Sequence, residues 1–468
     1  MKKKVISLML AACMVMGMTA CGASEATADS QPAADAATSE TQAATTDAAA
    51  ATTESTGDKE LAVQIGPDPE TIDPALNSAV DGGNMLLHAY ECLLIVGEDG
   101  TLQPGQAESY EVSEDGLTWT FHLRDGLKWS DGSDLTANDF VYSWKRVCNP
   151  EVAAPYAETV LGMVKGYDEA IDGNLDALGV SAPDDSTLVV ELANPCSYFG
   201  SLAAFATLSP VQEATIEANG EAWATAPETY VSNGPFYMTE WVPGSHITFS
   251  KNPYYWNADA IKLDRLKFVL MEDSNAAYSA YQTGEVLMIK DVPTEEIPSL
   301  TGTDDFYVDP IIGTYYISLN IQKAPFDDVN VRKALSLAID REYVASTLMQ
   351  GTYTAAGNFM GPGWMDTDGT EFMSNANGGK PYIDTTNFEA NLEEAKQLLA
   401  DAGYPDGEGF PTVEYLYNTD DKHKKIAEAL QNMWQKELGV TVNLDNQDWN
   451  VFLQTRKDGN YQIARNGW

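Results

Sequence analysis

The chain has 468 residues, a length that exceeds what one hydrophobic core usually organises and that predicts two or three domains. Its 70 Asp and Glu residues outnumber its 27 Lys and Arg residues, which gives a formal net charge of -43 at pH 7. Because such a surface repels phosphates and anionic lipids, the composition argues against a nucleic-acid partner and against electrostatic binding to a membrane.

The first 21 residues have the pattern of an export signal. Three lysines precede an apolar run from Val5 to Gly17, which is too short to cross a bilayer as a permanent helix. The run ends in the string MTACG, which resembles a bacterial lipobox, where the cysteine becomes the lipidated N-terminus after cleavage. We therefore expect a lipoprotein signal peptide over 1–21 with lipid on Cys21, and Cys13 is the alternative.

The stretch 22–57 lacks the residues that build a core. It contains no Lys, Arg or aromatic residue and is rich in Ala, Thr, Ser, Asp and Glu. Such a segment cannot bury enough apolar surface to offset the entropy lost on folding. It is predicted to be a disordered acidic linker between a lipid anchor and a folded body.

Three cysteines lie beyond the signal, at Cys92, Cys148 and Cys196. Their number is odd and no pair has C-x-x-C spacing, so neither a disulfide scaffold nor a zinc site is indicated. Free buried thiols are the prediction, with a single bridge among the three left open.

The folded body is predicted to begin near Leu61 and to mix helices with strands. In the first half the expected elements are a strand from Leu61 and helices over 85–94 and 137–147. Between the helices we expect a half-buried hairpin, with a strand over 117–123, a turn at 125–126 and a second strand over 127–129. In the second half they are helices over 389–402, 422–438 and from Asp448 to near Gly459, and strands over 440–444 and 461–464. Alternation of helices and strands in the second half indicates an α/β lobe.

Motifs that carry catalysis are missing from the sequence. It has no G-x-x-x-x-G-K-[ST], no G-x-S-x-G and no H-E-x-x-H, so we expect neither an enzyme nor a resident cofactor. The four histidines show no metal-ligand spacing.

The last stretch, 446–468, brings an aromatic and a cationic side chain together. The expected strand over 461–464 delivers Arg465 to the loop that follows, and Trp449 opens the preceding helix. A guanidinium beside a rigid apolar wall is suited to binding a carboxylate. The alternative is an ion pair between Arg465 and an acid of its own fold.

A known family resembles this chain along most of its length. The run WTFHLRDGLKWSDGSDLTANDFVYSW, residues 119–144, resembles the signature region of the bacterial extracellular solute-binding proteins of family 5. Further landmarks keep the order found in the oligopeptide-binding branch of that family, and they lie at 154–157, 232–236, 251–256, 313–320, 325–335, 416–419 and 423–425. The resemblance covers Leu61 to Trp468.

The resemblance implies an α/β fold of the periplasmic-binding-protein-like class II (cluster C), with two α/β lobes joined by a hinge and an additional smaller inserted domain. The implied parts are lobe I over 58–91 and 216–312, the inserted domain II over 92–215, and lobe III over 313–468. Because the family continues past its Gly-Trp with an Asp that binds the ligand's amino terminus, the chain is expected to be C-terminally incomplete.

The resemblance also implies a peptide site between the lobes. Arg465 and His423 would meet the C-terminal carboxylate of the ligand, Trp449 would wall a side-chain pocket, and Arg456 would lie near that pocket. For His423, a water-facing position at the start of a helix is the alternative.

Four further positions are implied to lie near the ligand, namely Ser78, Val80, Tyr156 and Tyr316. For the two tyrosines, packing in the core is the alternative role. Ser78 stands where the best-known members carry Glu, and Lys457 stands where they carry His, so peptide length and side-chain preference are open.

The implied function is that of the substrate-binding lipoprotein of a peptide ABC importer. Its expected partners are short peptides, the importer's membrane permease subunits and, through the lipid anchor, the outer face of the cell membrane; a monomer is expected, without nucleic acid. The alternatives are a family member for nickel, haem or a sugar, and a signalling-peptide receptor or surface chaperone.

Overall fold

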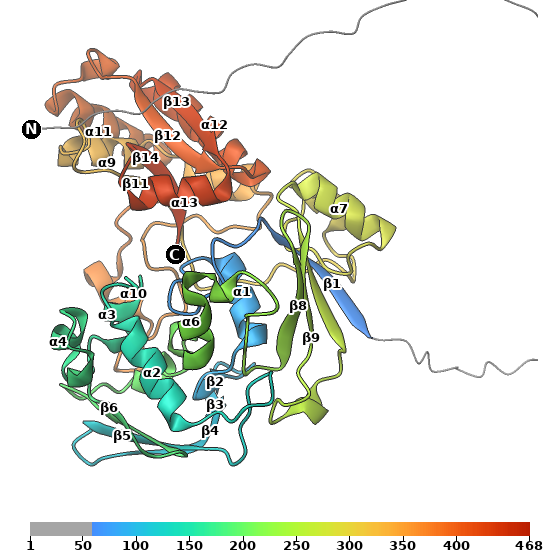
Figure 1. Cartoon of the computed structure of the whole chain (residues 1–468). Helices are drawn as coiled ribbons and strands as arrows, with labels where there is room; N and C mark the ends of the chain where they lie inside the picture. The colour runs from blue at the N-terminus through green and yellow to red at the C-terminus, as the bar shows by residue number, and fades with distance from the viewer. Residues whose placement is uncertain (1–58) are drawn as a thin grey trace, which may run out of the picture. The chain divides into compact units, whose positions relative to one another are not determined.

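The computed structural model describes residues 59–468. The expected signal peptide (1–21), with the expected lipidation site Cys21, and the expected linker (22–57) lie outside the described residues. Contacts within the chain group Gly57–Trp468 into one unit. Strands in the described part form three four-stranded sheets and one two-stranded sheet (Figure 1).

The first sheet joins the start of the described chain to residues nearly two hundred positions later. Its order is β1-β10-β9-β8, with β1 parallel to β10 and the other pairs antiparallel. Its strands are β1 (Glu60–Gly66), β8 (Phe236–Val242), β9 (His246–Lys251) and β10 (Arg265–Leu270). Phe249 and Phe268 are buried and meet edge to face, with ring centroids 5.7 Å apart. The strand predicted from Leu61 is therefore confirmed as β1.

The second sheet contains the start of the run 119–144 and corrects the predicted hairpin. Its order is β4-β5-β7-β6, all antiparallel, with β4 (Ala107–Val112), β5 (Thr118–Leu123), β6 (Val180–Asp184) and β7 (Thr187–Glu191). The predicted strand over 117–123 is β5, but it pairs with β4 and β7 and not with 127–129. Alternating burial reports which face of a strand is inward and says nothing about which strand lies beside it.

The predicted helix over 137–147 is confirmed as α2 (Ala137–Val147). Thr136 and Asp139 form a capping box at its start, which satisfies amide groups that the helix leaves unpaired. Phe140 and Trp144, both in α2, are fully buried and form its inward face.

The helix predicted over 85–94 is wrong in its bounds. The structure has α1 (Val80–Ala89), followed by the two-stranded antiparallel sheet of β2 (Leu94–Val96) and β3 (Leu102–Pro104). Gly82, in the first turn of α1, packs so closely that a Cβ there would lie 2.4 Å from the Thr71 carbonyl oxygen. Glycine lowers intrinsic helix propensity, so a contact remote from the local sequence decides where this helix begins.

The last sheet has the order β11-β14-β12-β13 (Figure 1). Its strands are β11 (Tyr315–Leu319), β12 (Val413–Asn418), β13 (Val442–Gln447) and β14 (Ile463–Gly467). The strand expected over 461–464 begins and ends later as β14, so Arg465 lies inside the strand and not in a loop after it.

Helices of the C-terminal part follow the predicted pattern closely. They are α9 (Val329–Leu337), α11 (Phe388–Asp401), α12 (Asp421–Leu438) and α13 (Trp449–Lys457). The predicted bounds of α11 and α12 are correct to within one residue. Gly439 ends α12 with a left-handed backbone (φ 68°), the conformation that glycine adopts without strain.

Short helices connect these elements. The remaining α-helices are α3 (Ala157–Leu161), α4 (Tyr167–Ile171), α5 (Phe199–Leu202), α6 (Glu213–Asn219), α7 (Ser274–Thr283), α8 (Ile297–Leu300) and α10 (Phe372–Asn375). A π-helical segment, η5, spans Tyr343–Leu348, and 3-10 turns span Leu175–Ala177, Ala206–Leu208, Gly220–Ala224, Ala258–Ala260, Ala376–Gly379 and Pro405–Gly407. None of the helices within 59–468 is both long and apolar enough to cross a membrane.

Buried side chains within 59–468 form two main clusters and two small ones, one of which joins Val269, Ala280 and Val286. The first lies within residues 65–270 and the second within residues 326–463. The third joins Leu416, Phe452, Leu453 and Ala464, and the more exposed Ala79 and Trp449 pack on it. This small cluster brings the segment before α1 against α13, although they are more than 350 residues apart in the chain.

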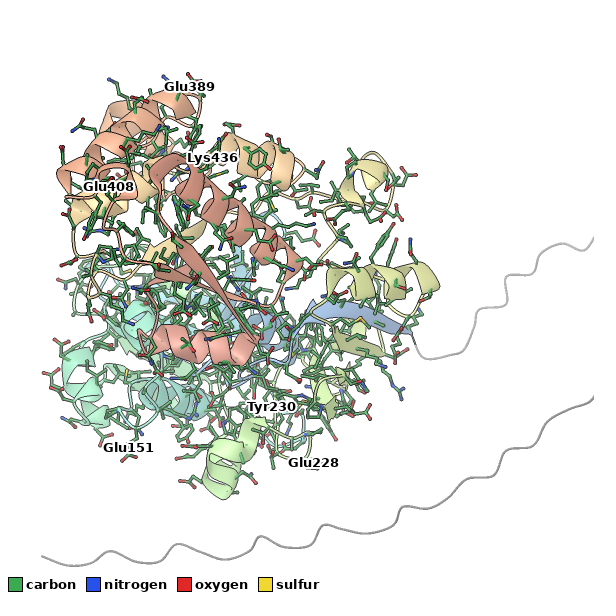
Figure 2. All side chains as sticks on the ribbon, turned by 90° about the horizontal axis from the view of Figure 1, so that it is seen from above. Glu151, Glu228, Tyr230, Glu389, Glu408 and Lys436 are labelled. Atoms are coloured by element: carbon green, nitrogen blue, oxygen red, sulfur yellow. The ribbon has the colours of Figure 1, made fainter. Side chains whose placement is uncertain are left out.

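The predicted state of the cysteines is confirmed, because Cys92, Cys148 and Cys196 are all buried and free. Burial raises the pKa of the Cys92 thiol to about 12. Many acidic side chains are exposed, although Asp73, Asp81 and Glu91 are buried. Glu151, Glu228 and Glu389 are among the exposed ones, whereas Tyr230 is buried (Figure 2).

A buried ion pair ties the loop after β1 to α2. Arg146 donates two hydrogen bonds to Asp73, with Nη1 to Oδ1 at 2.9 Å and Nη2 to Oδ2 at 2.5 Å. The two side chains are 11% and 4% exposed. Trp223 Nε1 donates a third hydrogen bond to Asp73 at 3.2 Å. Such a fork-like pair with a satisfied carboxylate is costly to break from one side.

Replacing Asp73 by Asn should lower the free energy of unfolding by about 3 kcal/mol, because the Arg146 guanidinium then loses its buried carboxylate. Urea unfolding followed by circular dichroism measures the change. Asp176→Asn is the matched control: Asp176 pairs with the neighbouring Lys145, but its side chain is 92% exposed, so the urea midpoint should stay almost unchanged. Equal losses in the two variants would contradict the role assigned to the buried pair.

Candidate ligand-binding site

Arg465 is a buried cation near the middle of the last sheet. It lies on β14, between β11 and β12, and is 9% exposed. Its Nε donates a hydrogen bond of 2.6 Å to Asn418 Oδ1 at the end of β12. None of the carboxylates within 59–468 forms an ion pair with it, so the expected alternative, an acid of its own fold, is not what holds Arg465. Burial lowers the pKa of the Arg465 guanidinium.

His423 lies close to Arg465, in the first turn of α12. Its backbone N–H donates a hydrogen bond of 2.9 Å to Asp420 Oδ1, and Asp420 thereby caps the helix. The imidazole packs beside Tyr315, with ring centroids 5.5 Å apart, and the side chain is 16% exposed. The alternative of a water-facing helix residue is therefore wrong.

The His423 imidazole is held in its neutral form. Burial, followed by the positive charges of Arg465 and Lys422, lowers its pKa to about 2. Its Nδ1 is buried and has no hydrogen-bond partner in the described part of the chain, and the Asp420 carboxylate is too far away at 3.8 Å. A buried guanidinium and a buried imidazole thus both have unused capacity to bind an anion.

Trp449, the first residue of α13, lies beside Arg465 as predicted. The Arg465 guanidinium carbon is 5.2 Å from the centre of the indole ring and 5.0 Å from the ring of Phe452, on which the indole stacks. Trp449 Nε1 donates a hydrogen bond of 3.3 Å to Asp81 Oδ2 on α1. The wall of the site is therefore fastened to a residue 368 positions earlier.

Arg456 occupies a neighbouring position on α13. Its Nη1 donates a hydrogen bond of 2.5 Å to Asn466 Oδ1, and its guanidinium carbon lies 5.4 Å from the centre of the Phe452 ring. Burial lowers the pKa of Arg456, while the nearby Tyr316 and Tyr156 act in the opposite direction. The structure thus brings both predicted tyrosines into the electrostatic neighbourhood of Arg456.

The two tyrosines come from different parts of the chain. Tyr156, which precedes α3, has its ring 5.3 Å from Phe205 and 6.1 Å from Trp468. Tyr316, on β11, has its ring 5.0 Å from Phe359. Both are partly buried, and Tyr156 also packs against the first hydrophobic cluster, so the alternative of core packing stays open for Tyr156.

Ser78 and Val80 flank the point where α1 begins. Val80 is 73% exposed and Ser78 is half-buried. Ala79, between them, packs on the cluster that contains Phe452 and Trp449. The two residues therefore lie next to the Trp449 wall, but no hydrogen bond within the described residues links Ser78 to Arg465 or His423.

Ion pairs that the sequence did not reveal, among them Lys425–Glu295, connect the C-terminal part to the earlier chain. Lys457 Nζ lies 2.8 Å and 2.7 Å from the two oxygens of Glu70, and Lys422 Nζ lies 2.7 Å from Asp291 Oδ1. Burial raises the pKa of the Asp291 carboxyl, but the charges of Lys290 and Lys422 outweigh it and lower the pKa overall. Pairs at least 130 residues apart leave no local signal in sequence, so only the tertiary structure reveals them.

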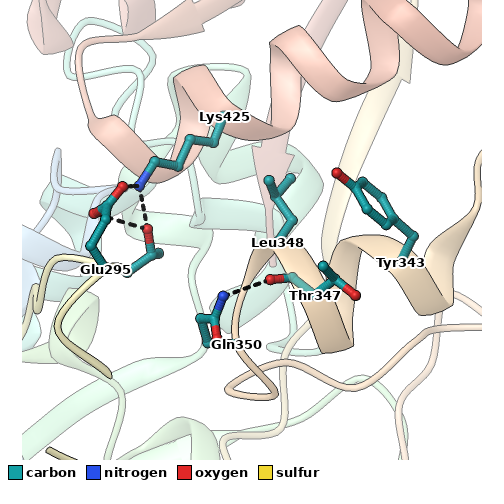
Figure 3. A pocket seen from close by; sticks show the side chains of 7 residues that line it. Glu295, Tyr343, Thr347, Leu348, Gln350 and Lys425 are labelled. Carbon is teal, nitrogen blue, oxygen red and sulfur yellow. Dashed lines mark hydrogen bonds and ion pairs between the residues drawn. The ribbon is translucent and has the colours of Figure 1, made fainter. Parts of the chain in front are cut away.

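A separate cavity of about 280 Å³ lies further along α12 (Figure 3). Its lining consists of Thr294, Glu295, Tyr343, Thr347, Leu348, Gln350 and Lys425. Lys425 pairs with Glu295 and also donates to Thr294, so its charge is already satisfied. No group of three or more His, Cys, Asp or Glu side chains within 59–468 is arranged to hold a metal ion.

Comparison with known proteins identifies the family. The family described as bacterial extracellular solute-binding proteins, family 5 Middle, matches residues 101–468. The oligopeptide-binding protein OppA of Bacillus subtilis (strain 168) is 37% identical over 426 residues, which are 89% of this chain and 76% of that protein. The periplasmic oligopeptide-binding protein OppA of Escherichia coli (strain K12) is 38% identical over 411 residues, 86% of this chain and 73% of that protein.

Solved structures agree with the sequence match. The crystal structure of Haemophilus influenzae OppA in complex with the peptide RPPGFSPFR is 33% identical, with a TM-score of 0.80 over 88% of this chain and 80% of that one. This likeness confirms the expected fold class, the α/β fold of the periplasmic binding proteins. The chain therefore belongs to family 5 of the bacterial extracellular solute-binding proteins.

Proposed function

We propose that this chain captures short peptides by their C-terminal carboxylate, as the substrate-binding component of a peptide ABC importer. One observation carries the proposal: among residues 59–468 no carboxylate forms an ion pair with the buried Arg465 guanidinium, although Asp420 acts on its charge at longer range, and Arg465 is near enough to the buried His423 imidazole to help lower its pKa. A buried charge without a counter-ion is costly, so a site of this kind favours an anionic ligand.

The chemistry of the pair suits a peptide terminus. A guanidinium can donate two parallel hydrogen bonds to one carboxylate, and such charge-assisted bonds are about twice as strong as neutral ones. The neutral His423 can donate one further hydrogen bond without adding a second positive charge beside Arg465. The names of the relatives, which are oligopeptide-binding proteins, support a peptide as the molecule that carries this carboxylate.

The remaining predicted residues take roles around the ligand's side chains. Trp449 provides a flat apolar wall, and Arg456 lies behind it next to Tyr156 and Tyr316. We propose that Val80 and Ser78 line the ligand from the side of α1. Binding mainly through the backbone and the terminal charge leaves the side chains free to vary, which suits a transporter of mixed peptides.

Closure by a hinge completes the proposal. Its parts are lobe I (58–91 and 216–312), the inserted domain II (92–215) and lobe III (313–468). Ligand that contacts two lobes at once favours the closed state through differential affinity. The Lys457–Glu70 and Lys422–Asp291 pairs would be made in that state, because each joins lobe I to lobe III.

In the cell we propose an extracytoplasmic monomer, held at the outer face of the membrane by lipid on Cys21 and recognised by the importer's permease subunits. No catalytic step and no cofactor is part of the proposal.

Isothermal titration with a mixed set of tri- to pentapeptides tests the central claim, that the chain binds short peptides. Amidating the C-termini of the same peptides should weaken binding strongly; absence of binding to any peptide would contradict the proposal.

The variant Arg465→Gln should weaken binding of a free-acid tripeptide by at least about 2 kcal/mol, or about thirtyfold, because the ligand carboxylate loses its charged partner. Isothermal titration measures the loss. The urea midpoint without ligand should not fall, because the variant removes a buried charge that has no counter-ion.

A matched control is Arg124→Gln, which removes a second Arg–Trp pair elsewhere in the chain. The Arg124 guanidinium carbon lies 3.6 Å from the Trp256 ring centre, and its Nε donates to the Gly105 carbonyl. This variant should lose stability and keep its peptide affinity. If Arg465→Gln instead lost stability and kept its affinity, Arg465 would have a structural role.

His423 makes the unliganded protein sensitive to acid. Its folded-state pKa is about 2, whereas an unfolded histidine titrates near 6.5, so only the unfolded state takes up the proton as pH falls. Stability from this group is therefore full above about pH 6.5 and is lost below it. Relative to His423→Gln, the wild type should lose about 2 kcal/mol between pH 7.5 and pH 5.0.

Urea unfolding of both proteins at the two pH values, without peptide, measures this difference. Because both carry the same Asp and Glu residues, their acid titrations cancel in the comparison. Parallel loss of stability in wild type and variant would contradict a buried neutral imidazole.

A further inference from the structure

Asp81 is a buried carboxylate that the proposed function leaves unused. It lies in the first turn of α1, directly after Val80, and is 5% exposed. Its Oδ2 accepts the hydrogen bond from Trp449 Nε1. Its Oδ1 is also buried, and no described residue donates a hydrogen bond to it.

The groups around Asp81 do not neutralise its charge. Burial raises the pKa of the carboxyl, and the backbone amides of Asp81 and Gly82, together with the charge of Lys290, only partly oppose this effect. Lys290 forms no ion pair with Asp81; its ammonium is 3.7 Å from Asp291 instead. An acidic residue in the first turn of a helix is favourable, but that benefit is small beside the cost of an uncompensated buried carboxylate.

Trp449 places Asp81 next to the anion site. The indole ring is 5.2 Å from the Arg465 guanidinium carbon, and its N–H points to Asp81. A cation and an anion of the protein thus border the same aromatic side chain. An indole also attracts the methylenes and the charge of a lysine or arginine side chain.

We propose that Asp81 is a specificity-determining residue that binds a cationic side chain of the peptide. Peptides with Lys or Arg near the C-terminus, whose terminal carboxylate contacts Arg465, are the ligand class it would select. The inference rests on the proposed function, because it requires the terminal carboxylate to contact Arg465. The local sequence around Asp81, SAVDGG, carries no signal for this role, because an acid in such a string has many structural uses.

The test scans lysine through a tripeptide of otherwise alanine, with norleucine and Nε-acetyl-lysine peptides as uncharged counterparts, by isothermal titration. In the wild type, one lysine position should bind at least tenfold more tightly than both counterparts, as expected for a hydrogen bond to a charged group. In Asp81→Asn, which keeps an oxygen for Trp449 Nε1, the lysine and norleucine peptides should bind equally within twofold.

Asp139→Asn is the control, because Asp139 is a partly buried acid in the first turn of a helix and its pKa is also raised by burial. The Asp139→Asn variant should keep the lysine preference.

Two outcomes would overturn the inference: a wild type with no lysine preference at any position, or a lysine preference that survives Asp81→Asn. Either would leave the proposed function standing, because the norleucine peptides would still bind. Should no peptide bind at all, the proposed function itself would fall. The wild-type comparison does not depend on whether Asp81→Asn folds.

Discussion

The site depends on the burial of the Arg465 guanidinium in a sheet that offers it no carboxylate. Its Nε is held by Asn418, its flat face lies against Trp449 and Phe452, and the rest of its hydrogen-bonding capacity is unused. A protein normally pairs a buried charge within its own fold, because the desolvation cost is several kcal/mol. Where the fold leaves the charge unpaired, an anionic ligand that pairs with it can compensate the desolvation cost on binding. The lowered pKa of His423 follows from the same cation and the same burial.

The wall beside this guanidinium is assembled from distant parts of the chain. Trp449 is fixed by its own helix and by Asp81, and the cluster around Phe452 includes Ala79 from the start of α1. Rotating or separating these segments would expose the indole and change the surroundings of Arg465. In the proposed function, ligand binding and closure are one event, because the ligand favours the state in which both segments contact it.

Sequence patterns predicted α2, α11 and α12 to within one residue, but missed the bounds of α1, β13 and β14 by two residues or more. Helices α11 and α12 have regular apolar spacing and end at or near a glycine, so local signals suffice. Helix α1 carries Gly82 and Gly83 in its first half, and its start is decided by packing against Thr71 and Asn77. The partner of β5 could not be predicted either, because alternation of apolar residues is the same whichever strand lies beside it.

The sequence by itself indicated the α/β class, favoured free thiols at the three cysteines, and predicted that Trp449 and His423 lie near Arg465. These depend on residue type and spacing, and motifs shared with a family record both. Only the tertiary structure decided that Arg465 lacks a counter-ion, that His423 is buried and neutral, and that Asp81 lies against Trp449. The reason is that charge balance and desolvation depend on which side chains come within a few ångströms of one another, and residues 368 positions apart leave no local trace of that contact.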